Sequence, residues 1–203
     1  MSQFIESVSI KDGLVENLDL HNLRCNKARL EVLMLTDTID LSEVIKPPKC
    51  FLKGHIKCRV LFSDKVHEVS YEKYKLRRIA KIQAVENNTI EYAYKFLDRS
   101  SLNELYQQKR DADEILIVRN GLLTDAFYYN VALLKGDQWF TPKHPLLNGV
   151  QRSRLLKEEL IKELDIKLKE INDFSFISLF NALTPLGAIQ VPIENIDKLL
   201  RNF

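Results

Sequence analysis

Glycine is scarce in this sequence, which contains six glycines among its 203 residues. Two phosphate-binding loops need glycines at fixed spacing: Gly-x-Gly-x-x-Gly in dinucleotide-binding folds and Gly-x-x-x-x-Gly-Lys-Ser/Thr in P-loop enzymes. Neither spacing occurs here, so neither kind of nucleotide binding is expected. A Gly-x-Ser-x-Gly nucleophile elbow is absent too, and four histidines leave little for a nucleophile–base relay.

An excess of charge of either sign is also missing. Lys and Arg total 30, Asp and Glu total 28, and the formal net charge is +2 at pH 7. A nearly neutral chain lacks the positive field that holds a polyanion. We therefore expect no nucleic-acid partner.

Long apolar runs are absent as well. The run at 115–118 is far shorter than the roughly 20 residues that a membrane-spanning helix needs. The first residues lack the basic stretch and apolar core of a secretion signal. Cys25, Cys50 and Cys58 are an odd number scattered through the chain, which favours reduced thiols over a disulfide framework. We expect a cytoplasmic protein with no membrane partner.

One group of residues has a metal-like spacing. His55 and Cys58 stand three positions apart, with Cys50 and His67 nearby. No second pair at zinc spacing follows, and all four residues fall in a segment predicted to be strands and loop. Ordinary strand and loop residues are the favoured interpretation, so no metal site is predicted.

The residues that are present describe a folded α+β protein. Hydrophobic residues make up 45% and charged residues 29%, a balance typical of globular domains. Alternation over 4–10 before a Lys-Asp-Gly turn predicts a strand entering a hairpin. Leucine spacing over 19–35 predicts a helix that Asp19 caps, and similar spacing predicts a helix over 150–164. A C-terminal helix is expected from about Ile193.

The polar Glu-Asn-Asn-Thr segment at 86–89 is rich in turn-forming residues and nearly free of apolar ones. We place a domain boundary there. The sequence thus predicts a small α+β domain over 1–86 and a larger α/β domain over 89–203.

Lys95 stands in an unusual setting, between aromatic and apolar residues just after this boundary. Desolvation there would lower the pKa of its amine and make it a Schiff-base nucleophile. On these residues alone, a solvated lysine that extends past an aromatic surface is the favoured alternative.

Two further features point to ligand binding. Asp125 lies in an otherwise apolar strand, where an unpaired charge is costly, so it needs a cationic partner. The loop at 146–152 contains Gly149 and opens a helix, whose free N–H groups suit a phosphate. The alternative for this loop is a simple helix start.

A series of short motifs over about residues 4–192 resembles, in order and spacing, the motifs of one enzyme family. In chain order they are Glu6-Ser7-Val8, Asp12-Gly13, His21-Asn22-Leu23-Arg24, Lys95-Phe96-Leu97-Asp98-Arg99, Ala112-Asp113-Glu114-Ile115-Leu116, Thr124-Asp125 with Asn130, Trp139-Phe140-Thr141-Pro142, Leu147-Asn148-Gly149-Val150-Gln151-Arg152 and Asn181-Ala182-Leu183. This series resembles the class IV pyridoxal-phosphate enzymes, which include branched-chain and D-amino-acid aminotransferases and 4-amino-4-deoxychorismate lyase. The lysine segment and the 181–183 segment are most similar to the lyase branch.

The resemblance implies a fold, a cofactor and a site. It implies a two-domain fold with a small α/β sandwich domain and a pseudo-barrel α/β domain, binding pyridoxal 5′-phosphate. Lys95 would be the catalytic residue, carrying the cofactor and moving the proton at the substrate carbon. Asp125 would replace the family's Glu beside the pyridine nitrogen. The implied cofactor-binding residues are Arg24, Lys95, Asp125, Asn130, Gly149, Val150, Gln151, Asn181 and Ala182.

Three functions follow from the resemblance. The first is the lyase reaction, which converts aminodeoxychorismate to pyruvate and 4-aminobenzoate for folate biosynthesis. The second is transamination of a branched-chain or D-amino acid, and the third is a catalytically inactive dimeric relative. The family begins with a further segment that this sequence lacks. We therefore expect a homodimer in which residues of 1–86 lie near the partner's cofactor lysine.

Overall fold

The computed structural model describes residues 2–197 and divides into two compact units. The first comprises Met1–Leu76 and Tyr94–Asp98, and the second comprises Arg77–Ala93 and Arg99–Phe203. This division differs from the boundary expected at 86–89. The chain leaves the first unit at residue 76, because the strand over 82–86 pairs within the second sheet. The segment that carries Lys95 then returns to the first unit.

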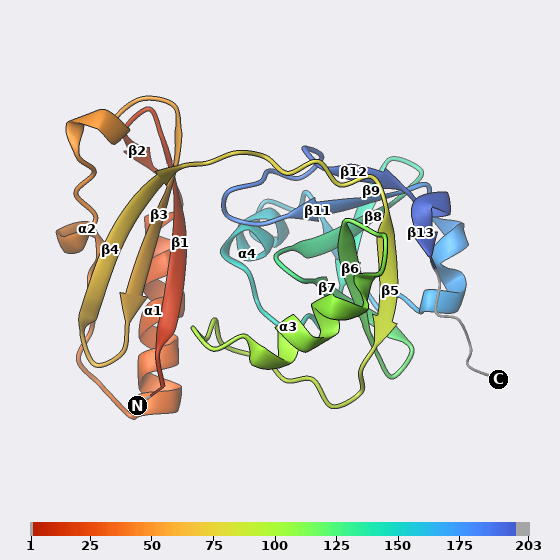
Figure 1. Ribbon diagram of the computed structural model, residues 1–203, viewed down its shortest axis with the longest axis horizontal. Coiled ribbons are helices and arrows are strands. Elements are labelled where there is room, and N and C mark those ends of the chain that lie inside the picture. Colours follow the sequence, from red (N-terminus) through yellow and green to blue (C-terminus); the bar gives the residue numbers. More distant parts are fainter. Residues whose placement is uncertain (1, 198–203) are drawn as a thin grey trace. The chain divides into compact units, whose positions relative to one another are not determined.

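The first unit is a four-stranded antiparallel sheet with one long helix (Figure 1). The strand order is β2-β1-β3-β4. Alternating residues of β1 turn one face inward, and α1 packs on that face to form a core with Phe4, Val8, Cys25 and Ala28. Its elements are β1 (Phe4–Lys11), β2 (Leu14–Val15), α1 (Leu18–Leu33), α2 (Leu41–Val44), the 3-10 helix η1 (Lys49–Phe51), β3 (His55–Phe62) and β4 (Val66–Lys73).

The beginning of α1 differs in detail from the prediction. The helix expected over 19–35 is observed as Leu18–Leu33, but Asp19 does not cap it. The N-cap is Asn17, a left-handed residue with φ 53° whose side chain makes no capping hydrogen bond. Asp19 instead lies in the first turn, where its charge favours the positive end of the helix dipole.

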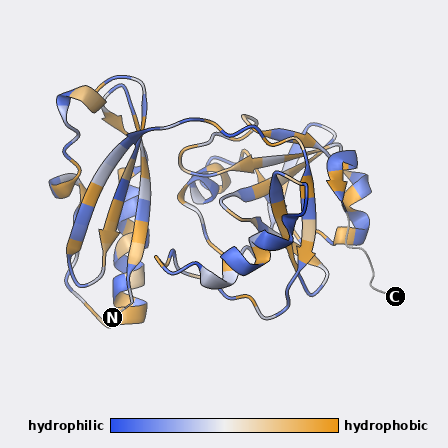
Figure 2. Ribbon diagram, viewed as in Figure 1, coloured by the Kyte–Doolittle hydropathy of each residue, from blue (hydrophilic) through white to orange (hydrophobic). Residues whose placement is uncertain are grey.

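The second unit is a mixed sheet with short helices. Along the main path the order is β10-β9-β8-β7-β6-β5-β13, while β11 pairs with β8 and β12 with β11. Apolar residues recur along these strands (Figure 2) and meet in a core that includes Leu116, Val131 and Ile177. Its elements are β5 (Ile82–Glu86), α3 (Ser100–Tyr106), η2 (Gln107–Lys109), β6 (Glu114–Arg119), β7 (Leu122–Ala126), β8 (Asn130–Lys135), β9 (Gln138–Pro142), α4 (Val150–Lys157), β10 (Lys162–Leu164), η3 (Leu168–Asp173), β11 (Phe176–Phe180), β12 (Gln190–Pro192), η4 (Ile193–Asn195) and β13 (Ile196–Asp197).

Two predicted helices are wrong, one in its extent and one in its type of structure. The helix expected over 150–164 ends at Lys157, because the chain turns at Glu159 with φ 58° and then forms β10 along β9. In place of a helix from about Ile193, η4 is followed by β13, which pairs with β5. The rest of that predicted helix lies outside the described residues.

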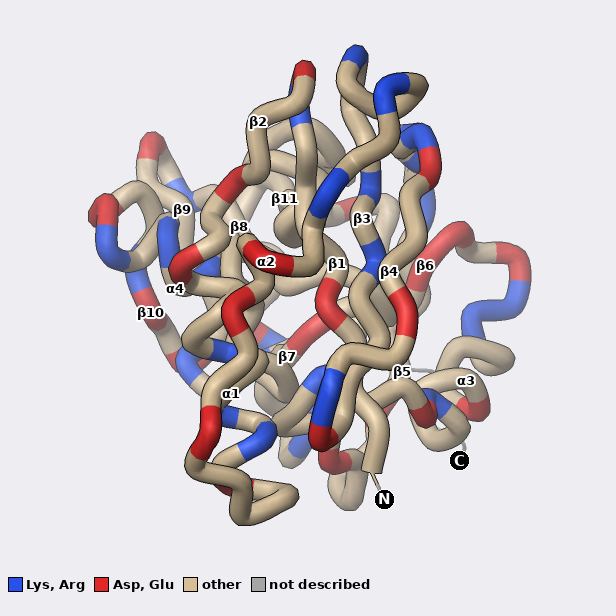
Figure 3. The backbone as a smooth tube through the Cα atoms, turned by 90° about the vertical axis from the view of Figure 1, so that its left-hand side faces the viewer, with Lys and Arg blue, Asp and Glu red and all other residues tan. Residues whose placement is uncertain are grey.

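The α+β class expected from the sequence is confirmed. Segments with Lys or Arg and segments with Asp or Glu are both spread over the chain (Figure 3), and the formal net charge is +2. Within residues 2–197, no helix has the length and apolar character needed to cross a membrane. The cysteines are free thiols; burial raises the pKa of Cys25 to about 12 and that of Cys58 to about 11.

Candidate functional site

Asp125 is a buried carboxylate, 6% exposed, on β7. Its register partner on the neighbouring strand is Asn130, whose Nδ2 donates to Asp125 Oδ1 at 2.7 Å. The N–H of Leu147 donates to the other carboxylate oxygen at 2.9 Å. Burial nevertheless raises the pKa of Asp125 to about 6. Among the described residues no cation lies within ion-pair distance of Asp125. The charge of Arg152, in the same unit, lowers its pKa only in part.

Asn130 joins this carboxylate to the start of α4. Besides its bond to Asp125, its Nδ2 donates to the carbonyl of Leu147 at 2.9 Å. Its Oδ1 lies against Gly149, where a Cβ would be only 2.0 Å away. Gly149 is therefore required by this close approach, since its φ of −71° is open to any residue. The predicted residues Asp125, Asn130 and Gly149 thus form one connected group.

The start of α4 follows directly from that group. Gly149 is the N-cap and offers no capping side chain, and the first turn contains no acidic residue. The first N–H groups of a helix have no acceptor within the helix, so those of Val150 and Gln151 are donors at its positive end. Arg152 is buried, pairs with Glu163 at 2.7 Å and donates to Asn148 Oδ1, just before this turn, at 3.2 Å.

Asn181 and Ala182 form a turn after β11. The Asn181 Oδ1 accepts the N–H groups of Leu183 and Thr184 at 2.9 and 3.0 Å. Its Nδ2 donates to the carbonyl of Tyr128 at 3.1 Å. Tyr128 lies in the β7–β8 turn that follows Asp125, so the turn at 181–182 is fixed against the same hairpin. The second unit therefore gathers all the predicted residues except Arg24 and Lys95.

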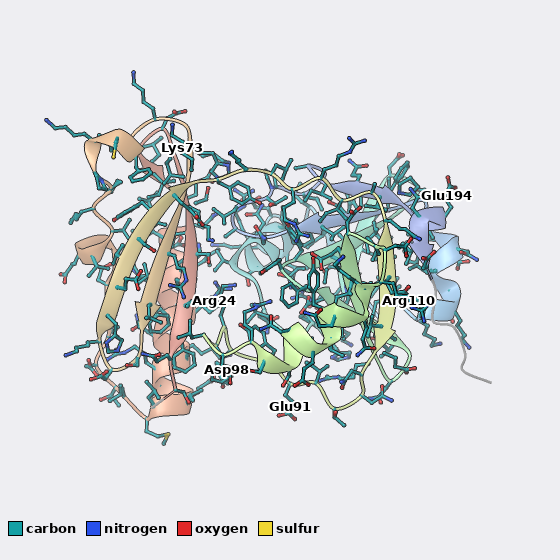
Figure 4. All side chains as sticks on the ribbon, viewed as in Figure 1. Arg24, Lys73, Glu91, Asp98, Arg110 and Glu194 are labelled. Atoms are coloured by element: carbon teal, nitrogen blue, oxygen red, sulfur yellow. The ribbon has the colours of Figure 1, made fainter. Side chains whose placement is uncertain are left out.

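Arg24 lies on α1 in the first unit (labelled in Figure 4) and pairs with Glu6 of β1. Its Nε and a terminal nitrogen donate to the two Glu6 oxygens at 2.8 and 2.5 Å, and His21 Nδ1 lies 2.7 Å from the same carboxylate. Burial alone would raise the pKa of Glu6, but Arg24 and His21 lower it to about 2. Glu6 therefore stays ionised and holds the guanidinium in place.

Glu6 and His21 belong to motifs of the family resemblance, but no site role was predicted for either. Their places in the sequence nevertheless indicate one. Glu6 occupies an inward position of the alternating strand, where a lone charge is costly, and His21 and Arg24 are one helical turn apart. An inward acid on the strand and two basic residues on one face of the following helix together predict the cluster of Glu6, His21 and Arg24.

Lys95 is half-buried in the segment that returns to the first unit. Its carbonyl accepts the N–H of Ile5 at 3.0 Å, and Phe96 pairs with Phe4 in an isolated bridge. The rings of Phe4 and Phe96 stack at 5.1 Å, and Tyr94 meets Phe96 edge-on at 5.9 Å. The aromatic setting expected from the sequence is present, and the backbone of Lys95 is fixed one residue along β1 from Glu6.

Comparison with known proteins places these residues in a family context. The model of the amino-transferase class IV family matches residues 60–191. An uncharacterized protein of Haemophilus influenzae is 32% identical over 92% of this chain and 100% of its own length. A solved structure, described as a candidate 4-amino-4-deoxychorismate lyase from Haemophilus somnus 129pt, is 29% identical with a TM-score of 0.86, covering 92% of this chain and 98% of that one. A Mycobacterium tuberculosis aminotransferase in its PLP-bound form shares the fold, with a TM-score of 0.74, 12% identity and coverage of 97% and 81%.

Proposed function

The chain belongs to the class IV aminotransferase family, and from that premise we propose that it is a pyridoxal-phosphate enzyme acting as a 4-amino-4-deoxychorismate lyase. The observation that carries the cofactor assignment is Asp125. Asp125 is a buried carboxylate with a pKa raised to about 6 and, among the described residues, no cation within ion-pair distance, so a positive hydrogen-bond donor would stabilise it. A protonated pyridine nitrogen is such a donor.

The other residues of the second unit fit the cofactor as well. Asn130 and the N–H of Leu147 hold the Asp125 carboxylate in one orientation. The absent Cβ at Gly149 lets Asn130 approach the start of α4, where the N–H groups of Val150 and Gln151 suit a phosphate. The turn at Asn181-Ala182 is braced against the same hairpin.

Arg24 and Lys95 are assigned from the family resemblance. Arg24 is proposed to bind the cofactor phosphate, and its bidentate pairing with Glu6 fixes the guanidinium before any ligand arrives. Lys95 is proposed to carry the cofactor covalently and to move the proton at the substrate carbon.

The chemistry divides between cofactor and protein. When bound, pyridoxal phosphate supplies an electron sink for the bond that breaks at the substrate carbon. Asp125 would hold a proton at the pyridine nitrogen and so maintain that electron withdrawal. The Lys95 amine would donate and accept protons at the reacting carbon. The hydrogen bonds of Asn130 and Leu147 keep Asp125 from turning away during these steps.

The lyase is preferred over transamination for two reasons. The Lys95–Arg99 segment and the Asn181 turn resemble the lyase branch, and the Haemophilus somnus structure is described as a candidate lyase. We propose release of pyruvate from aminodeoxychorismate, leaving 4-aminobenzoate for folate biosynthesis in the cytoplasm. The second candidate is a class IV aminotransferase, favoured by the family model itself.

Assembly is proposed to be a homodimer. Helix α1 exposes Leu23 and Leu30, at 67% and 51%, on one side of the helix, and its C-cap residue Met34 is 80% exposed. A second copy is a natural cover for such an apolar stripe. Light scattering should report twice the mass of 23.7 kDa at micromolar concentration, and a monomer that remains active would refute the dimer.

Two assays test the activity. Lactate dehydrogenase coupled to the reaction reports pyruvate released from aminodeoxychorismate, whereas an amino acceptor such as 2-oxoglutarate reports transamination. Pyruvate release without an acceptor supports the lyase. Turnover that requires the acceptor supports the aminotransferase, and no turnover in a protein that binds the cofactor supports an inactive relative.

A further inference from the structure

Arg99 occupies an aromatic cage in the second unit, directly before α3. Its guanidinium lies 4.6 Å from the ring centre of Phe127, 5.0 Å from that of Tyr128 and 5.3 Å from that of Tyr92. Arginine stacks on aromatic faces through its planar, weakly hydrated cation. Three rings therefore hold this group in one orientation, beside a Tyr128 ring that is 52% exposed.

The positive charge of Arg99 has no counter-ion in the described part of the chain. One terminal nitrogen donates to the Tyr92 hydroxyl at 3.2 Å and the other to the Phe127 carbonyl at 2.5 Å. The buried Nε has no acceptor there. Since a guanidinium has five N–H donors, each terminal nitrogen keeps about one N–H for a ligand besides the buried Nε–H.

A neighbouring arginine gives a direct contrast. Arg77 lies over the same Tyr128 ring at 5.7 Å, but it pairs with the buried Glu114 at 3.1 Å. Its charge is therefore neutralised within the unit. Of these two cations on one ring, Arg99 is the one left for an external anion.

The position of Arg99 relates it to the proposed site. Phe127, which accepts its hydrogen bond, is two residues after Asp125, and Tyr128 accepts a hydrogen bond from Asn181. Arg99 thus braces the same hairpin turn that ends at Asp125 and adjoins the Asn181 turn. The Arg99 guanidinium would therefore lie next to a ligand bound beside Asp125 and Asn181.

We propose that Arg99 binds a carboxylate of the substrate and selects substrates that carry one. A carboxylate matches the planar fork of a guanidinium in a bidentate, charge-assisted contact. The rings exclude water from the faces of the cation and leave its edge for that contact. This inference rests on the proposed function for the identity of the ligand, while the carboxylate preference itself is measurable without it.

Benzoate and benzamide are matched probes, because they share a ring and differ in charge. Calorimetric titration of the cofactor-loaded protein should show tighter binding of benzoate. Arg99→Met should lower the affinity for benzoate by about ten- to a hundredfold, which corresponds to the loss of a charge-assisted hydrogen bond. The affinity for benzamide should stay unchanged. Arg77→Met is the control and should keep the preference, although it removes a cation from the same ring.

Three results would overturn the proposal. The first is an unchanged preference of Arg99→Met for benzoate over benzamide, and the second is an equal loss of affinity for both probes. The third is a loss of pyridoxal-phosphate affinity as large as the loss of benzoate affinity. If Arg99→Met does not fold, Arg99→Lys retains the charge without the planar fork, and its preference should be intermediate. If the native protein binds no cofactor, the proposed function fails. An Arg99-dependent preference in the cofactor-free protein would still support the carboxylate site, and its absence would refute it.

Discussion

Replacing Asp125 with Asn should change how the free energy of unfolding depends on pH. The burial of the carboxyl group determines the direction of that change. The carboxyl group is buried and its pKa is raised to about 6, whereas an exposed Asp has a pKa of about 4. Its protonated form is therefore favoured by folding. The stability that it contributes is fully present below about pH 4 and is lost as pH rises through about 6.

The size of the effect follows from the two pKa values. A difference of about two pKa units corresponds to about 3 kcal/mol of folding free energy, lost by the cofactor-free protein between about pH 4 and pH 7. Asp125→Asn removes this titration. It also points an amide N–H₂ at one of two donors, Asn130 or Leu147, at a cost of about 1–3 kcal/mol that does not vary with pH. The pH dependence of the difference in stability therefore reports the ionisation of Asp125 and not the lost hydrogen bond.

Urea denaturation of cofactor-free protein between pH 4 and pH 8 measures this difference. The free energy of unfolding of the Asn variant, minus that of the native protein, should rise by about 3 kcal/mol over the interval. Asp137→Asn, in the exposed turn after β8, controls for the loss of one carboxylate. A difference that stays constant with pH would refute the claim that burial raises the Asp125 pKa.

Further predictions concern the cofactor-binding groups. Arg24→Ala should weaken pyridoxal-phosphate affinity by about ten- to a hundredfold in a fluorescence titration, because a charge-assisted contact is lost, and unchanged affinity would remove Arg24 from the site. Gly149→Ala should lower the melting temperature, because its methyl group would lie 2.0 Å from Asn130 Oδ1. Adding Asn130→Ala should recover part of that loss, and no recovery would show that the clash is not its cause.

Local patterns predicted those parts of the molecule that depend on neighbouring residues. Alternation predicted the first strand and leucine spacing predicted α1. The apolar neighbours of Asp125 predicted a carboxylate in a costly setting, and its burial and raised pKa agree with that. The loop at Gly149 was found from its place before a helix. In each case the pattern that made the prediction lies within about ten residues, although the contacts that fix Asp125 and Gly149 come from residues farther along the chain.

Features set by distant pairing were not predictable in this way. Helix α4 ends at Lys157 because the chain turns at Glu159 and residues 162–164 pair with β9. Leucine spacing does not reveal this pairing. The unit boundary falls at residue 76, since β5 is held by β6. The role of Glu6 depends on Arg24, which is 18 residues away in the chain.

The central claim is that Lys95 carries pyridoxal phosphate. Borohydride reduction of protein incubated with the cofactor, followed by peptide mass mapping, tests it directly, because reduction fixes the lysine adduct. We predict an adduct on the peptide that contains Lys95, with no fixed adduct in Lys95→Ala. An adduct on a different lysine, or one that persists in Lys95→Ala, would contradict the assignment, and no adduct in the native protein would contradict the account of a pyridoxal-phosphate enzyme.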